Sequence, residues 1–135
     1  MKATILRFIS AATFALFTLC ASQNAVAGDL VVIANSGTNL SASEVRDVFL
    51  GEKQFAGSTK LIPVDNAAQQ ESFLTKTMQM NSVKYSGIWT KKAFRDGLSA
   101  PAMKSSDAEV IEYVKRTPGA VGYVGSSASG VNIVK

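Results

Sequence analysis

Short apolar runs of strand length alternate along this chain with signals that start a helix. The run Leu30–Ala34 is continuously apolar, which is typical of a strand in a sheet covered on both faces. The motifs Ser41-x-x-Glu44 and Ser106-x-x-Glu109 are capping boxes, which satisfy free backbone N–H groups at a helix start. The pattern predicts strands over 30–34, 60–64, 120–124 and 131–134, and helices beginning near residues 41, 67, 81 and 106. The order β-α-β-α-α-α-β-β predicts an α/β domain with a central sheet of about four strands.

The first 27 residues have the three parts of a secretory signal peptide. Lys2 and Arg7 form a basic start, residues 8–19 are mostly apolar, and Ala25-Val26-Ala27 offers a small-x-small cleavage site. An apolar stretch of about twelve residues is too short to cross a bilayer, which needs roughly twenty. We expect cleavage after Ala27, export to the periplasm, and a single folded domain over residues 28–135 with no membrane span.

Composition removes most enzyme chemistries from consideration. The chain has no His, and its single cysteine, Cys20, leaves with the signal peptide. Lipid attachment at Cys20 is the alternative, which the large Leu19 before it disfavours. Without His or Cys, a domain has no Ser-His or Cys-His nucleophile and lacks the commonest metal ligands. We therefore expect no enzyme, no catalytic residues, no metal and no cofactor.

The charge of residues 28–135 is mild. Lys2 and Arg7 are two of the fourteen basic residues, so this part keeps twelve basic and ten acidic residues, a net charge of +2. No run of Lys and Arg exceeds two residues, which argues against a nucleic-acid partner. At helical spacing, Tyr85 and Trp89 are expected in the core more than on an exposed contact surface.

Two turns are candidate ligand sites, because open α/β sheets bind ligands beyond the carboxyl ends of their strands. The first turn, 35–41, follows the first strand, and the second, 65–70, follows the next one. Ordinary turn formation and helix capping are the alternative roles for the same polar residues. The side chains proposed to bind a ligand are Asn35, Ser36, Thr38, Asp65, Asn66 and Gln69.

Three segments resemble the phosphate-binding periplasmic proteins of ABC transporters, and more narrowly their short, single-lobe members. These segments are Val45–Lys53, Leu61–Asp65 and Thr117–Val124, the last reading TPGAVGYV. The stretch around Tyr85, Trp89, Lys92 and Phe94 is also similar. The resemblance implies one three-layer lobe of a type 2 periplasmic-binding-protein fold, with a mixed sheet of four to five strands and helices on both faces.

The resemblance also implies a phosphate site, with a departure in this chain. In two-lobed relatives a Ser-Gly-Thr turn at a helix start binds the anion, with an Arg just upstream. Here Ala67-Ala68-Gln69 and Pro63 occupy those places, whereas Ser36-Gly37-Thr38 offers a similar turn elsewhere.

Two functions follow from this resemblance. The first is binding of phosphate or another small oxyanion for an ABC transporter permease. The alternative is a periplasmic protein-interaction module that keeps the fold, has lost phosphate binding and contacts another envelope protein.

Overall fold

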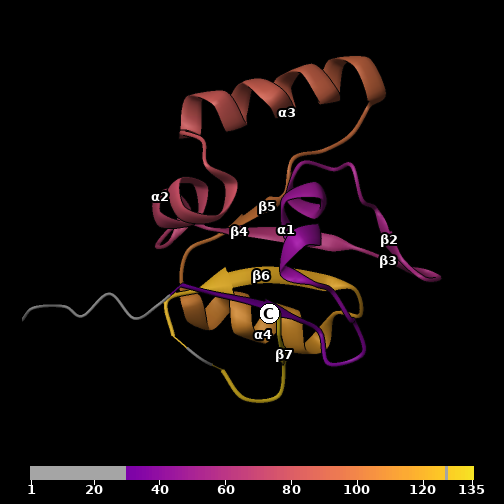
Figure 1. Ribbon diagram of the computed structural model, residues 1–135, viewed down its shortest axis with the longest axis vertical. Coiled ribbons are helices and arrows are strands. Elements are labelled where there is room, and N and C mark those ends of the chain that lie inside the picture. Colours follow the sequence, from indigo (N-terminus) through magenta and orange to yellow (C-terminus); the bar gives the residue numbers. More distant parts are fainter. Residues whose placement is uncertain (1–29, 127) are drawn as a thin grey trace, which may run out of the picture.

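The computed structural model describes residues 30–126 and 128–135, and its centre is a mixed sheet with the strand order β5-β4-β6-β1-β7 (Figure 1). The predicted signal peptide lies outside the described residues. β4 runs parallel to β5 and β6, whereas β1 runs antiparallel to β6 and β7. The sheet strands are β1 Val31–Ala34, β4 Ile62–Asn66, β5 Ala102–Lys104, β6 Ala120–Val124 and β7 Asn132–Ile133.

The helices begin close to the predicted capping residues. At the start of α1 the Glu44 carboxylate accepts from the Ser41 backbone N–H at 2.8 Å, and at α4 the Ser106 hydroxyl accepts from the Glu109 N–H at 3.3 Å. No helix in the described ranges is both long and apolar enough to cross a membrane. The helices are α1 Ala42–Phe49, α2 Gln70–Phe73 with its π-helical continuation Leu74–Met78, α3 Ser82–Asp96 and α4 Asp107–Arg116.

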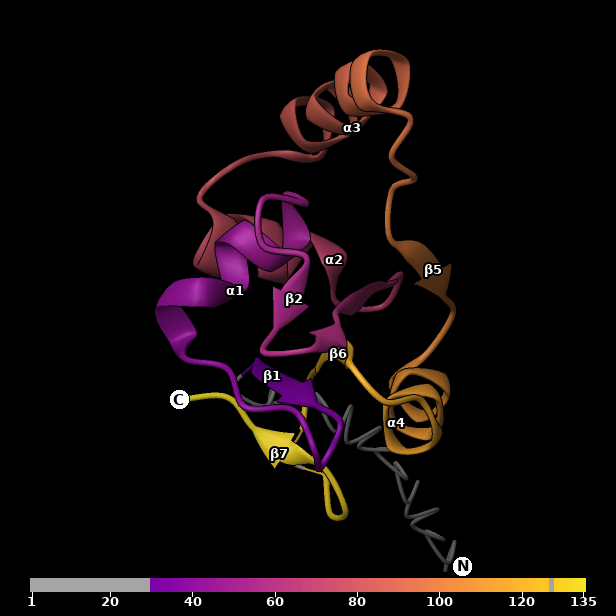
Figure 2. The same cartoon turned by 90° about the vertical axis from the view of Figure 1, so that its right-hand side faces the viewer.

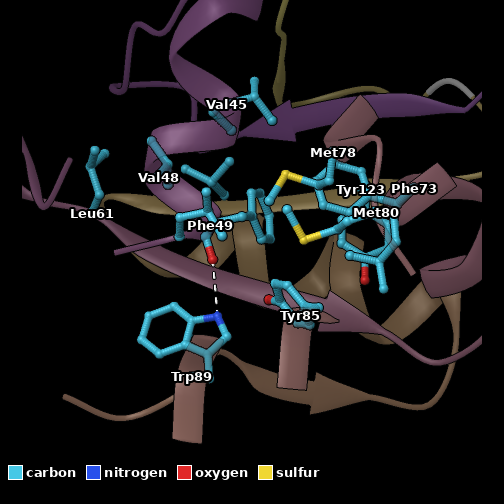
Figure 3. Packing of buried hydrophobic residues seen from close by; sticks show 14 residues of the cluster. Val45, Val48, Phe49, Leu61, Phe73, Met78, Met80, Tyr85, Trp89 and Tyr123 are labelled. Carbon is cyan, nitrogen blue, oxygen red and sulfur yellow. Dashed lines mark hydrogen bonds between the residues drawn. The ribbon is translucent and has the colours of Figure 1, made fainter. Parts of the chain in front are cut away.

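Helices cover both faces of the sheet and create two apolar clusters. On one face α1, α2 and α3 pack around Phe49, Phe73 and Tyr123, where the Phe73 and Tyr123 rings stack with centroids 3.9 Å apart (Figure 3). On the other face α4 packs its Val110 and Val114 against the sheet. Figure 2 shows α1 and α2 on one side of β1 and β6, and α4 on the other. This arrangement confirms the predicted three-layer α/β class.

Two local elements were not predicted. A hairpin forms from β2 Phe55–Ala56 and β3 Thr59–Lys60, and β5 adds a fifth strand to the sheet. The count of about four strands from the sequence pattern therefore lacked β5, whereas the four to five strands implied by the resemblance are confirmed. β5 has only three residues, most of them exposed, and its backbone bonds come from the distant β4, so it leaves no apolar run in the sequence.

We predict that Gly122→Ala destabilises the domain by about 1–3 kcal/mol, the usual cost of overpacking a core. A Cβ at Gly122 on β6 would come within 2.5 Å of the Val110 Cγ1 atom and 3.2 Å of the Val64 Cγ2 atom. Gly87 in α3 is the matched control, since a Cβ there meets nothing within 4 Å. Gly87→Ala should stabilise the protein by roughly 0.5–1 kcal/mol through helix propensity. Urea unfolding measures both, and equal effects of the two substitutions would contradict the packing argument.

Candidate functional site

The direction of β1 separates the six predicted ligand residues into two groups. Val31 of β1 pairs with Val124 of β6, and Ala34 pairs with Val121, so β1 ends where β6 begins. β4 runs the other way and ends beside the end of β6. The turn that follows β1 and the turn that follows β4 therefore lie at opposite edges of the sheet. The structure places Asn35, Ser36 and Thr38 at one edge and Asp65, Asn66 and Gln69 at the other.

At the edge where β4 and β6 end, the polar groups of the protein form hydrogen bonds mainly with one another. The Asn66 Nδ2 group donates to the Asp107 Oδ1 atom at 2.6 Å and to the Tyr123 carbonyl oxygen at 2.9 Å. The other Asp107 oxygen accepts from the Gly125 N–H at 3.0 Å. Gln69 lies over Gly125, where an added Cβ would come within 2.5 Å of its Nε2 atom. This network joins the ends of β4 and β6 to the start of α4.

The backbone donors of the turn after β4 are also engaged. The Ala68 N–H donates to the Asn66 Oδ1 atom at 3.0 Å, and the Gln69 N–H donates to the Asn66 carbonyl at 3.1 Å. The Ala67 N–H donates to the Lys104 carbonyl at 2.8 Å. A ligand anion at this turn would have to compete with these bonds and with the Asp107 carboxylate.

Asp65 lies beneath this edge as a buried hydrogen-bond acceptor. Its Oδ1 atom accepts from the Tyr123 hydroxyl at 2.8 Å, and its Oδ2 atom accepts from the Tyr85 hydroxyl at 2.9 Å. Burial raises the pKa of Asp65, and the two tyrosine hydrogen bonds oppose that rise. Burial and the neighbouring carboxylate also raise the pKa of both tyrosines, so both remain hydroxyl donors. The sequence gives no signal for this triad, since the two tyrosines come from distant elements.

At the opposite edge, the Asn35 side chain caps the C-terminal end of α4. Its Nδ2 group donates to the Val114 carbonyl at 2.9 Å and to the Lys115 carbonyl at 3.2 Å, and its Oδ1 atom accepts from the Gly37 N–H. Ser36 is exposed and Thr38 is buried. The observed bonds of Asn35 belong to turn and capping chemistry, the alternative role considered for this segment. A ligand role for the six residues stays a prediction.

A third place, which sequence reasoning missed, is a pocket of about 300 Å³ between the end of α1, the β2–β3 hairpin and the segment that follows α3. We call it the lysine-lined pocket. No carboxylate is among its lining residues, which include Lys53, Lys60, Leu61, Pro63, Trp89 and Leu98. Elsewhere in the described ranges, no three His, Cys, Asp or Glu side chains gather as a metal site would require.

We predict that Asp65→Asn changes how stability depends on pH. Because burial raises the pKa of Asp65 in the folded state, the wild-type protein loses stability as pH rises from below the ordinary value of 3.8 through the raised pKa. The variant lacks this loss, so its free energy of unfolding should increase relative to wild type as pH rises from below 3.8 toward neutral pH. Urea unfolding of both proteins across that range measures the difference. If the free energies of unfolding of the two proteins changed with pH in parallel, that would contradict a raised pKa of Asp65.

Comparisons with known proteins show similarity at the level of the fold. No protein-family model matches this chain, and no curated protein matches its sequence. Among solved structures, an ABC-type phosphate transport receptor from Vibrio cholerae superimposes with a TM-score of 0.57 at 16% identity, covering 78% of this chain and 45% of the receptor. PstS from Borrelia burgdorferi gives a TM-score of 0.47 at 20% identity, covering 78% of this chain and 46% of PstS.

The chain thus spans somewhat less than half the length of each of these two solved proteins. The likeness to the Vibrio receptor agrees with the mixed five-stranded sheet and with helices on both of its faces. The described residues therefore adopt the fold of one periplasmic-binding-protein-like lobe.

Proposed function

We propose that residues 28–135 form an exported, solute-binding-like domain that binds a small anion, with phosphate as the first anion to test. The observation that carries this proposal is the shared fold with a phosphate transport receptor of Vibrio cholerae. The net charge of +2 in this part of the chain is compatible with an anionic ligand. In this proposal residues 1–27 are removed during export, and the bound anion is delivered to an ABC transporter permease.

A single lobe should bind its ligand less tightly than a two-lobed receptor. Two-lobed receptors close around a hinge and bury the ligand between the lobes. One lobe alone leaves one side of the ligand in water, so more of the ligand's charge stays hydrated. The edge formed by Asn66, Gln69 and Asp107 also presents a carboxylate, which opposes an anion there. We therefore expect micromolar or weaker affinity.

We predict that phosphate stabilises the exported protein against heat more than sulfate or chloride does at matched ionic strength. With a Kd of about 10 μM, about 1 mM phosphate would add roughly 2.7 kcal/mol. For a domain of this size that corresponds to a rise in Tm on the order of 10 °C.

Scanning calorimetry measures the rise in Tm, and the intact mass of the same preparation shows whether the chain begins at Gly28. Equal shifts with all three anions would exclude a specific phosphate site of this affinity.

The outer face of α3 favours a second function, docking of another envelope protein. Val83 and Phe94 lie eleven positions apart, about three helical turns, and therefore share a face. Their side chains are 79% and 95% exposed, and the space beside Gly87 between them is open. Figures 1 and 2 both show α3 at one end of the molecule, where no other labelled element covers its outer side. Two large exposed apolar side chains on one uncovered helix face make this face the candidate docking surface.

If α3 docks a protein, Phe94→Ser should abolish a specific cross-link to one envelope protein in an extract. Phe55→Ser is the matched control, because Phe55 is also an exposed phenylalanine, at 54%, but lies on the β2–β3 hairpin. Mass spectrometry of the cross-linked product identifies the partner. Loss of the product in both variants would indicate general adhesion, and its retention in Phe94→Ser would exclude this face.

A further inference from the structure

We propose that the lysine-lined pocket binds a small amphipathic anion, in which one acidic group is attached to an apolar body about the size of a single ring. This inference rests on the proposed anion-binding function and gives that function a place and a class of ligand. The place differs from both turns predicted from the sequence, since the pocket lies between α1, the β2–β3 hairpin and the end of α3.

The wall of the pocket is a fixed aromatic surface. The Trp89 indole N–H donates to the Phe49 carbonyl at 3.1 Å, a bond that Figure 3 shows at the margin of the buried cluster. The same ring packs against Gly51, where a Cβ would come within 2.7 Å of the Trp89 Cη2 atom. Gly51 has a φ of 71°, so the close approach and the backbone both require glycine there. Leu61 and Leu98 extend this apolar wall.

The charge around the pocket favours an anion. Lys60 is exposed and forms no ion pair with any described residue. Lys53, in contrast, forms an ion pair with Glu44, whose Oε1 atom lies 3.2 Å from the Lys53 Nζ atom. Three other hollows that contain charged residues include carboxylates. Glu44 lies in the hollow beside Thr38, Glu71 in the hollow beside α2, and Glu109 and Glu112 in the hollow beside α4. Among these four hollows, the lysine-lined pocket is therefore the one whose lining includes lysines but no carboxylate, and Lys60 is its lysine without an ion pair to a described residue.

Carbonyl groups at the end of α1 would repel an anion if they were free. The Phe49 carbonyl accepts from Trp89, and the Gly51 carbonyl accepts from the Gln54 Nε2 group at 3.3 Å. Both are thus engaged with donors of the protein, and the positive charge of Lys60 remains available to the ligand.

The size of the pocket limits the ligand. Its volume of about 300 Å³ lies at the lower end of the range, roughly 300–1,000 Å³, in which proteins hold small molecules. Trp89 and Leu61 are buried, whereas Pro63 and Leu98 are only half-buried and line the pocket. Inorganic phosphate would contact a lysine but leave the exposed parts of Pro63 and Leu98 in water. An aryl phosphate or an aromatic carboxylate would cover these parts, and burying that apolar area adds affinity.

Trp89 is the only tryptophan of the chain and lines this pocket, so a change in its emission reports on the pocket and on the core beside it. We expect phenyl phosphate to change the Trp89 emission saturably at constant ionic strength. Its Kd should be about tenfold lower than that of inorganic phosphate, since a contact worth 1.4 kcal/mol is tenfold in affinity. Benzyl alcohol, which has the ring without the charge, should bind more weakly than phenyl phosphate. Isothermal titration gives the same constants independently of the indole.

Lys60→Glu tests the role of the cation. It should raise the Kd for phenyl phosphate by about tenfold or more, the effect of losing one charge-assisted contact. Lys84→Glu is the matched control, because it makes the same charge change at an exposed lysine on α3 that does not line the pocket. Lys60→Gln provides a milder variant, and circular dichroism checks that all three fold.

The outcomes separate this inference from the proposed function. A lower Kd for phenyl phosphate that Lys60→Glu abolishes and Lys84→Glu preserves supports the pocket. Anion binding that leaves Trp89 emission unchanged and is insensitive to Lys60→Glu overturns the pocket but retains the proposed function. Absence of heat and of emission change with both phosphates overturns both.

Discussion

Tyr123, in the central strand β6, connects two helices on one face of the sheet with the neighbouring strand β4. Its ring stacks on Phe73 at 3.9 Å and lies 5.6 Å from the Phe49 ring, which holds α2 and α1 against the same face of the sheet. Its hydroxyl donates to Asp65, and its carbonyl accepts from Asn66, both on β4. The second oxygen of Asp65 then accepts from Tyr85 of α3. A buried carboxylate is tolerated here because two hydroxyl donors replace the water it loses.

The orientation of β1 has the larger consequence for function. In a sheet of parallel strands, both turns would meet at one edge and their polar groups would be combined in one site. Because β1 is antiparallel to β6, the two turns are separated by the length of the strands. The Asn35 side chain consequently donates a hydrogen bond to a carbonyl at the end of α4. The Asn66 side chain donates one to Asp107 at the start of the same helix. Both asparagines position α4, one at each end.

Electrostatics distinguishes the remaining places where an anion could bind. The edge beyond β4 and β6 holds Asp107 and the buried Asp65, and the donors of its turn already have acceptors within the protein. The lysine-lined pocket has an exposed cation beside a rigid apolar wall. A solute-binding-like fold in this chain is therefore compatible with a ligand position that the resemblance to phosphate-binding proteins does not imply, because fold alone does not specify the site.

The sequence by itself determined the local elements whose signals are short-range. The apolar run Leu30–Ala34, the capping residues Ser41 and Ser106 and the strand in TPGAVGYV each act within a few residues, and the structure has a strand or helix at each. The tertiary structure alone decided which strands run antiparallel, where β5 pairs, the Asp65 triad and the lysine-lined pocket. Each of these joins residues that are distant along the chain, such as Gly51 with Trp89 or Asp65 with Tyr123. Their energies come from burial and hydrogen bonds between elements, which periodicity and capping do not record.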